Sequence, residues 1–177
     1  MRIKNLIPTA ILALFVTGVG LMAQNLSTLD IPLETPDGDQ TSIAEIGADK
    51  VTIVSFGATW CVPCKKEMKA INEIYSELQD KGVEYIAVFI DNTKTMAKVG
   101  PYVKGKKFKF PVLLDPNSEV FETVNGTEVP YALIYDQNGE LQFKHDGYLD
   151  GDEEHIKEEA FSLTESPENG SEAESGM

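Results

Sequence analysis

Two cysteines separated by two residues are the feature of this chain with the clearest chemistry. They occur in the stretch Trp60-Cys61-Val62-Pro63-Cys64, directly after an apolar run and at the start of a helical pattern. Unpaired N–H groups and the positive end of the helix dipole stabilise a thiolate at such a position. Lowering a thiol pKa from about 8.5 to about 7 raises the thiolate fraction at neutral pH from a few per cent to roughly half. Pro63 fits the first helical turn, where its missing N–H leaves no hydrogen bond unmade.

The second cysteine begins the apolar stripe of the helix, so we expect Cys64 to point inward and to be less accessible than Cys61. One exposed nucleophile and one shielded resolving thiol are what thiol–disulfide exchange requires. The alternatives are a structural disulfide and half of a metal site. A bridge between these two positions closes too small a loop to stabilise much. A metal site would need further Cys or nearby His ligands.

Strand and helix patterns alternate around the cysteines. Residues 51–56 (VTIVSF) and 83–90 (VEYIAVFI) are continuous apolar runs typical of buried strands. Residues 62–80 between them predict a helix that ends before Gly82. The apolar stripe of this helix consists of Cys64, Met68, Ile71, Tyr75 and Leu78. This strand–helix–strand succession predicts a right-handed parallel unit.

The rest of the chain predicts further elements of the same sheet. We predict three more helices, over residues 93–104 (interrupted at Gly100-Pro101), 117–124 (capped by Asn117) and 152–163 (with an acidic first turn). We predict three more strands, over residues 110–114, 131–135 and 141–144. The last two flank Gln137-Asn138-Gly139, which favours an antiparallel hairpin. The predicted fold class is therefore α/β, with a central mixed sheet and helices on both faces.

Composition excludes several classes of function. The 177 residues include 15 Lys+Arg against 29 Asp+Glu, a formal net charge of −14. This balance argues against a nucleic-acid partner, because neutralising phosphates needs a basic face. Two cysteines cannot build a disulfide-dense scaffold, so the hydrophobic core must support the fold. With His145 and His155 as the only histidines, a His-rich zinc or copper site is not expected, and we predict neither a metal nor a cofactor.

The first 23 residues are typical of a secretory signal peptide. Arg2 and Lys4 precede an apolar run over residues 6–22, and Ala23 offers a small residue for cleavage. We expect cleavage after Ala23, which places the mature chain outside the cytoplasm. The alternative is an uncleaved segment that tethers the protein to a membrane.

The opposite end is strongly acidic. From Asp150 onward the chain has ten acidic residues and one lysine. Residues 164–177 have almost no apolar content, and such a composition predicts a disordered, solvated tail. The folded domain is therefore expected over residues 24–163.

From about residue 29 to residue 163, the sequence resembles the thioredoxin superfamily, and within it the TlpA/ResA-like extracytoplasmic thiol-disulfide oxidoreductases. The first match is VTIVSFGATWCVPCKKEM, where the family has a strand, then Trp-Cys-x-x-Cys, then Lys and Glu in the helix. The second is Val129-Pro130 ahead of a strand, which matches the family's cis-proline. The third is the helix and strand over about 92–116, which match the insertion that separates this group from plain thioredoxins. The resemblance implies a thioredoxin-like, three-layer fold with a helix–strand insertion.

The resemblance also implies roles for individual residues. Cys61 would be the attacking thiol and Cys64 the resolving thiol of a redox-active disulfide. Pro130 would be a cis-proline that faces the cysteines, and the backbone of Val129 would pair with an extended substrate strand. The remaining substrate contacts would come from the rim beside the cysteines, formed by Trp60, Val62 and Pro63.

Glu67 is the third catalytic candidate. It matches a Glu that this group carries one helical turn after the second cysteine, and it lies at the edge of the apolar stripe. Thioredoxin's buried Asp, six residues before the first cysteine, is Ser55 here and cannot act as a base. A partly buried Glu67 with a raised pKa could take the proton of Cys64. The alternative is a solvated Glu67 that pairs with Lys66 or Lys69.

We therefore predict a periplasmic or secreted, monomeric reductase of client-protein disulfides, supplied with electrons by a membrane-linked donor. Within the same class, a disulfide oxidant or isomerase is the alternative, because direction depends on the reduction potential. From a different class, a copper-handling module would need a third ligand, and neither His145 nor His155 falls in a loop expected beside Cys61. A peroxidase is disfavoured, because no sulfenate-stabilising group is evident around Cys61.

Overall fold

Within residues 25–164, seven strands form one mixed sheet in the order β2-β1-β5-β4-β3-β6-β7. The strands are β1 (Leu33–Glu34), β2 (Gln40–Thr41), β3 (Val51–Gly57), β4 (Val83–Phe89), β5 (Val112–Leu114), β6 (Tyr131–Tyr135) and β7 (Leu141–Asp146). The helices are α1 (Ile43–Ile46), α2 (Val62–Asp80), α3 (Val99–Lys106), α4 (Glu119–Thr123) and α5 (Asp152–Thr164), with short 3-10 turns η2 (Leu26–Leu29) and η3 (Met96–Lys98).

The computed structural model describes residues 25–164. The expected signal peptide over 1–23 therefore lies outside the described residues. The expected acidic tail over 164–177 does too, apart from Thr164, which is the last residue of α5. No helix in the part of the chain that the structure describes is long and apolar enough to cross a membrane.

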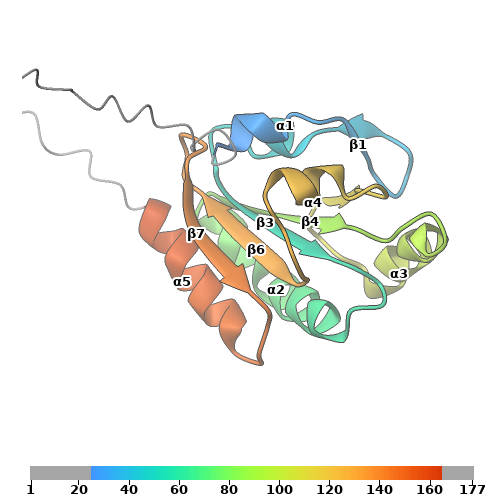
Figure 1. Cartoon of the computed structure of the whole chain (residues 1–177). Coiled ribbons are helices and arrows are strands. Elements are labelled where there is room, and N and C mark those ends of the chain that lie inside the picture. The colour runs from blue at the N-terminus through green and yellow to red at the C-terminus, as the bar shows by residue number, and fades with distance from the viewer. Residues whose placement is uncertain (1–24, 165–177) are drawn as a thin grey trace, which may run out of the picture.

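Helices cover both faces of the sheet, as predicted for an α/β fold (Figure 1). Strands β3, β4 and β5 run parallel at its centre, while β6 and β7 form the expected antiparallel hairpin. Residues of β3 alternate between two cores: Ile53 packs with α2 and α5, and Val54 packs with α1 and α4. Every residue of β3 and β4 is buried, which explains their continuous apolar sequences.

Helix α2 has the predicted bounds and orientation. It begins at Val62, with Cys61 as its N-cap and Pro63 in its first turn. The predicted stripe is buried along its whole length, and Glu67 is buried with it. Gly82 follows the helix with φ +76°, a left-handed conformation that glycine adopts without strain.

The insertion differs in detail from the prediction. The chain forms the 3-10 turn η3 and then α3, which runs to Lys106, rather than a helix over 93–104. We expected Gly100-Pro101 to interrupt this helix, but Pro101 lies in the first turn of α3. The N–H that proline lacks has no helical partner at that position, so the helix is not broken.

A helix forms within the predicted range 117–124, but it is shorter than predicted, and the prediction of Asn117 as its cap is wrong. Ser118 has a left-handed φ of 57°, so the helix begins at Glu119. The carboxylate of Asp115 accepts hydrogen bonds from the N–H groups of Glu119 (2.8 Å) and Phe121 (3.0 Å). Asp115 therefore caps the helix from the end of β5.

The elements before β3 were not predicted. They are two to four residues long, too short to show a periodic pattern. Strand β1 pairs with β2 and, through Glu34 opposite Leu114, extends the sheet beyond β5. Helix α1 is capped by Ser42, whose hydroxyl accepts the N–H of Glu45.

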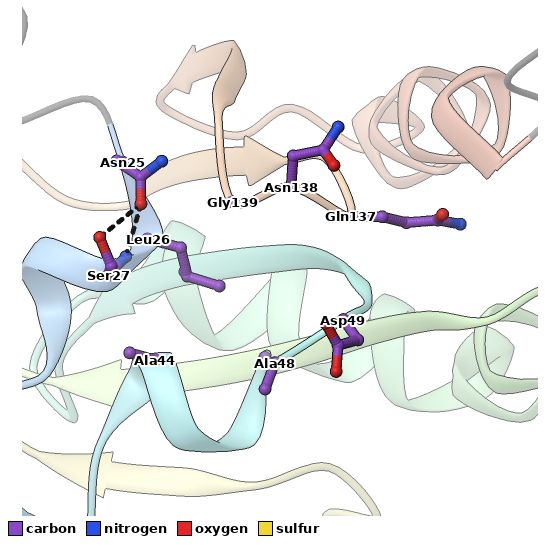
Figure 2. Close-up of a pocket in the computed structure, with 10 residues that line it drawn as sticks. Asn25, Leu26, Ser27, Ala44, Ala48, Asp49, Gln137, Asn138 and Gly139 are labelled. Carbon is purple, nitrogen blue, oxygen red and sulfur yellow. Dashed lines mark hydrogen bonds between the residues drawn. The ribbon is translucent and has the colours of Figure 1, made fainter.

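The chain enters the described domain at the end of the sheet opposite the cysteines. Asn25 pairs with Glu140 beside the β6–β7 turn, whereas Cys61 follows the other end of β3. A surface pocket lies at this entry end, between η2, the turn after α1 and the β6–β7 turn (Figure 2). In Figure 2 the side chain of Asn25 accepts hydrogen bonds from Ser27, and Asn138 stands on the facing turn. This pocket is therefore separate from the cysteine site.

Candidate active site

Cys61 and Cys64 form a disulfide at the N-terminus of α2. Their Cα atoms are 5.4 Å apart, and the N–H of Cys64 donates to Sγ of Cys61 over 3.1 Å. In the reduced protein the same N–H and the helix N-terminus would stabilise a thiolate on Cys61. Cys61, the expected nucleophile, therefore lies at a position that lowers the pKa of its thiol.

Cys61 is more accessible than Cys64, as predicted, but the difference between them is small. Cys61 is 5% exposed and Cys64 is 1% exposed, so both are buried in this disulfide-bonded form. The two cysteines pack with Ala58, and Ile90 and Val129 cover this small cluster. Cys61 remains the more accessible of the pair, but it does not stand free on the surface.

A close approach between α2 and β3 holds Cys64 in place. A Cβ built at Gly57 would lie 3.1 Å from Cβ of Cys64 and 2.7 Å from Cε of Met68. A side chain at Gly57 would therefore displace the end of the Met68 side chain and crowd Cys64. Glycine at the end of β3 lets the resolving cysteine lie directly against the sheet.

The peptide bond between Val129 and Pro130 is cis, as the resemblance implied. The carbonyl oxygen of Val129 lies 3.7 Å from Sγ of Cys61. Pro130 is buried at the start of β6, and its carbonyl accepts the N–H of Gly147 over 2.9 Å. These contacts bring the β6 strand and the loop after β7 to the edge of the cysteine site.

Exposed apolar side chains surround the cysteines. Trp60 is 57% exposed and Val62 is 60% exposed, and Pro63 is exposed beside them. Leu149, which is 76% exposed, belongs to the loop after β7 that is bonded to Pro130 through Gly147. Sequence reasoning missed Leu149, because only the return of the chain from β7 brings this loop to the same end of the sheet.

Glu67 is buried rather than partly solvated. It is 1% exposed, and its Oε1 accepts hydrogen bonds from Ser55 Oγ (2.5 Å) and Tyr85 OH (3.0 Å). The alternative of a surface Glu67 paired with lysines is wrong, because Lys66 pairs with Asp150 and Lys69 with Glu73.

Burial dominates the electrostatics of Glu67. Loss of hydration raises its pKa from 4.5 to about 7, and the nearby Asp152 adds to this increase. The hydrogen bonds from Ser55 and Tyr85 act in the opposite direction, because they stabilise the ionised carboxylate. A carboxyl group with a pKa near neutrality is suited to exchange protons with a thiol.

Asp91 is a second buried carboxylate at the site, and the sequence analysis missed it. It lies two residues after the end of β4 and is fully buried. Its carboxylate accepts hydrogen bonds from the backbone N–H of Thr59 (2.7 Å) and from the hydroxyl of the same residue (2.6 Å). Thr59 lies two residues before Cys61, so Asp91 holds the loop that leads into the cysteines. Its position at the carboxyl end of a parallel strand was the available signal.

We expect Asp91→Ala to lower the free energy of unfolding by about 2–3 kcal/mol, because it removes both hydrogen bonds that Thr59 donates to this buried carboxylate. Asp91→Asn can keep both contacts, by accepting the N–H and donating to the hydroxyl, and should lose about 1 kcal/mol or less. Urea unfolding of the oxidised protein measures both values. Equal losses from the two variants would show that the charge of Asp91, not its hydrogen bonds, stabilises the loop.

No group of three or more His, Cys, Asp and Glu side chains in residues 25–164 is arranged to hold a metal ion. His145 pairs with Asp152 over 3.1 Å, and His155 lies near Glu159 on α5. Neither histidine therefore joins the cysteines in a group that could hold copper.

Comparison with known proteins identifies the family. The model of the AhpC/TSA family matches residues 22–144, more than half of the chain. The chain belongs to the AhpC/TSA family.

Relatives and solved structures agree with this assignment. The thiol-disulfide oxidoreductase ResA of Bacillus thuringiensis subsp. konkukian is 37% identical over 92 residues, covering 52% of this chain and 52% of that protein. ResA of Bacillus cereus (strain ZK / E33L) is 31% identical over 123 residues, covering 70% and 66%. The match thus spans about half to two thirds of the length of these relatives.

The fold is shared with thioredoxin-like proteins. The solution structure of an uncharacterized thioredoxin-like protein from Porphyromonas gingivalis has a TM-score of 0.65 and 35% identity, covering 76% of this chain and 90% of that one. The predicted thioredoxin-like fold and the resemblance to ResA-type proteins are therefore confirmed.

Proposed function

We propose that this AhpC/TSA family member is a thiol-disulfide oxidoreductase that reduces disulfide bonds of client proteins through the Cys61–Cys64 couple. The observation that supports this most directly is the pairing of the two cysteines at the start of α2, beside the cis peptide Val129-Pro130. The names of the relatives, which are thiol-disulfide oxidoreductases, support the same activity.

In the proposed reaction, the thiolate of Cys61 attacks one sulfur of a client disulfide and forms a mixed disulfide, releasing the other client sulfur as a thiolate. Cys64 then loses its proton and attacks Sγ of Cys61. The second client sulfur leaves as a thiolate, and the Cys61–Cys64 disulfide seen in this structure is formed. Two electrons pass from the dithiol to the client. Glu67 is proposed as the base that takes the proton of Cys64.

Client segments are proposed to bind beside Val129. Its backbone can pair with an extended peptide, while Trp60, Val62 and Pro63 supply an exposed apolar rim around Cys61. Clients whose cysteine is flanked by apolar residues fit this rim best, because burying apolar surface stabilises the complex.

Leu149 tests this binding surface. Half-burying a leucine against a client contributes about 1 kcal/mol, so Leu149→Ala should lower kcat/KM for a protein disulfide about fivefold. Turnover of a small disulfide such as oxidised glutathione should stay at the wild-type rate, because it does not reach the loop. An equal loss of kcat/KM on both substrates would show that Leu149 supports the fold and does not bind clients.

The direction of electron flow is tested by the reduction potential of the cysteine couple. A reductant should have a reduction potential of about −270 mV, whereas a strong oxidant has one of about −120 mV. Equilibration of the protein with glutathione or dithiothreitol buffers, followed by thiol labelling, measures this value. A potential near the oxidant end would replace the reductase by the oxidant or isomerase, and the absence of insulin reduction would reject the activity itself.

The proposed location is periplasmic or secreted, supported by the basic start and apolar run of residues 1–23. The proposed partners are client proteins with oxidised cysteines and a membrane-linked electron donor, and the proposed state is a monomer. The described chain begins at Asn25, at the end of the sheet far from Cys61. If residues 1–23 stay attached as a tether, we therefore propose that the cysteines face away from the membrane. The net charge of −14 argues against nucleic acid as a partner.

A further inference from the structure

Two hydroxyl groups on neighbouring strands bind the same oxygen of Glu67. Ser55 Oγ on β3 and Tyr85 OH on β4 both donate to Oε1, over 2.5 and 3.0 Å. The two strands pair in parallel with Ile53 opposite Tyr85, so Ser55 and Tyr85 lie on the face that α2 covers. Both donors are fully buried, so no water competes with them at the surface.

The other oxygen of Glu67, Oε2, is buried and has no hydrogen-bond partner among residues 25–164. Buried carboxylate oxygens are almost always hydrogen-bonded, so this exception calls for an explanation. Since both donors bind Oε1, the oxygen left to accept a proton is Oε2.

Cys64 lies over the neighbouring position of the same strand. Its Sγ is 3.5 Å from the point that a Cβ at Gly57 would occupy, and Gly57 lies two residues after Ser55 on the same face of β3. Same-face positions of a strand are about 7 Å apart. The sulfur of Cys64 and the carboxylate of Glu67 therefore lie over adjacent positions on the same face of β3.

We propose that Ser55 and Tyr85 are positioning residues that hold Glu67 by Oε1 and so leave Oε2 as the oxygen that takes the proton of Cys64. This inference rests on the proposed function, in which Glu67 is the base. Neither hydroxyl touches the reacting sulfurs in this arrangement; both act through Glu67.

The step that they assist is the resolution of the mixed disulfide. Cys64 transfers its proton to Oε2 and attacks Sγ of Cys61, which forms the Cys61–Cys64 bond and breaks the bond between Cys61 and the client. The electron pair of the broken bond leaves with the client sulfur as a thiolate, which water protonates. Glu67 returns its proton to solvent before the next turnover.

The charged and titratable groups around Glu67 define the expected pH dependence. Tyr85 faces it from β4, Asp152 from α5 and Tyr148 from the loop before α5, and Cys64 precedes it on α2. Burial and Asp152 raise the pKa of Glu67, and the two hydroxyl donors lower it. Removing either donor should therefore raise the pKa of Glu67 further and move the base form to higher pH.

The test compares Ser55→Ala and Tyr85→Phe with wild type. Each variant should shift the rising limb of the pH profile for mixed-disulfide resolution upward by about one pH unit, with the rate recovered at higher pH. Tyr75→Phe is the matched control. Tyr75 lies in the same core, and its hydroxyl donates to another buried carboxylate, Glu84, over 2.6 Å, so its loss should leave the profile in place.

A second measurement does not depend on catalysis. Titration of Glu67 by carbon-13 NMR in the oxidised protein, where the cysteines do not ionise, should show the same upward shifts in both variants. An active wild type whose profile or Glu67 titration is unmoved by both variants would refute this inference alone, as would a rate that falls equally at every pH. A wild type that exchanges no disulfides would instead refute the proposed function on which it rests.

Discussion

Replacing Cys64 by serine should leave the protein covalently joined to its clients. Cys61 is the more accessible cysteine, and its sulfur accepts the N–H of Cys64 at the start of α2, where a thiolate is stabilised. It can still attack a client disulfide in the variant. Without a thiol at position 64, the mixed disulfide cannot be resolved from within the protein. Catalytic turnover should therefore cease while covalent complexes accumulate, which non-reducing gels and intact mass spectrometry would measure.

Cys61→Ser is the paired control. It removes the sulfur that lies 3.7 Å from the carbonyl of Val129, and it leaves only Cys64, which is 1% exposed. It should lose turnover to the same extent but form no complexes. If Cys61→Ser were instead the variant that accumulates complexes, the two cysteines would have exchanged roles, and the proposed attack from the rim beside Val129 would be wrong.

The part of the fold that positions the cysteines could be predicted because its signals are long. Strands β3 and β4 are seven residues each and buried on both sides, and α2 maintains its stripe over about four turns. Short elements give no such signal. Strand β1 has two residues and is stabilised by pairing with β5, a segment about eighty residues later in the chain.

The sequence predicts the site residues that belong to a local motif, but not those that only tertiary contacts bring together. Cys61, Cys64 and Pro130 lie in recognisable sequence contexts, and the structure brings them together. Ser55 and Tyr85 are thirty residues apart and meet only because β3 and β4 pair in a particular register. No periodicity in the sequence encodes that register.

The burial of Glu67 could not be predicted from the sequence either. Its position on the helix, about 60° round from Cys64, predicts an edge residue with partial exposure. A buried carboxyl group is costly unless hydrogen bonds compensate. Here the hydroxyls of Ser55 and Tyr85 supply that compensation, so Glu67 can lie inside the core rather than at its edge.

Glu67→Gln should slow the resolution of mixed disulfides by about 10–100-fold at pH 8. General-base catalysis contributes about 10²–10⁴-fold in enzymes, and water can replace part of it here. Because the pKa of Glu67 is about 7, the wild-type rate should rise with pH through that value as the base form appears. The Gln variant should lack this rise, which stopped-flow measurement of client release between pH 5 and 9 would detect.

The same substitution has a signed effect on stability that does not depend on catalysis. The pKa of Glu67 is about 7 in the folded protein against 4.5 when hydrated, so the folded state binds this proton more tightly. The stabilisation from this extra proton binding is fully present below about pH 4.5 and is lost as pH rises to about 7. Over this range the free energy of unfolding falls by about 3 kcal/mol. Unfolding of the oxidised wild type should therefore become easier over this range, and Glu67→Gln should remove that part of the pH dependence. A Gln variant with wild-type exchange rates across pH 5–9 would refute the catalytic role, even if the stability difference were found, because burial alone explains the latter.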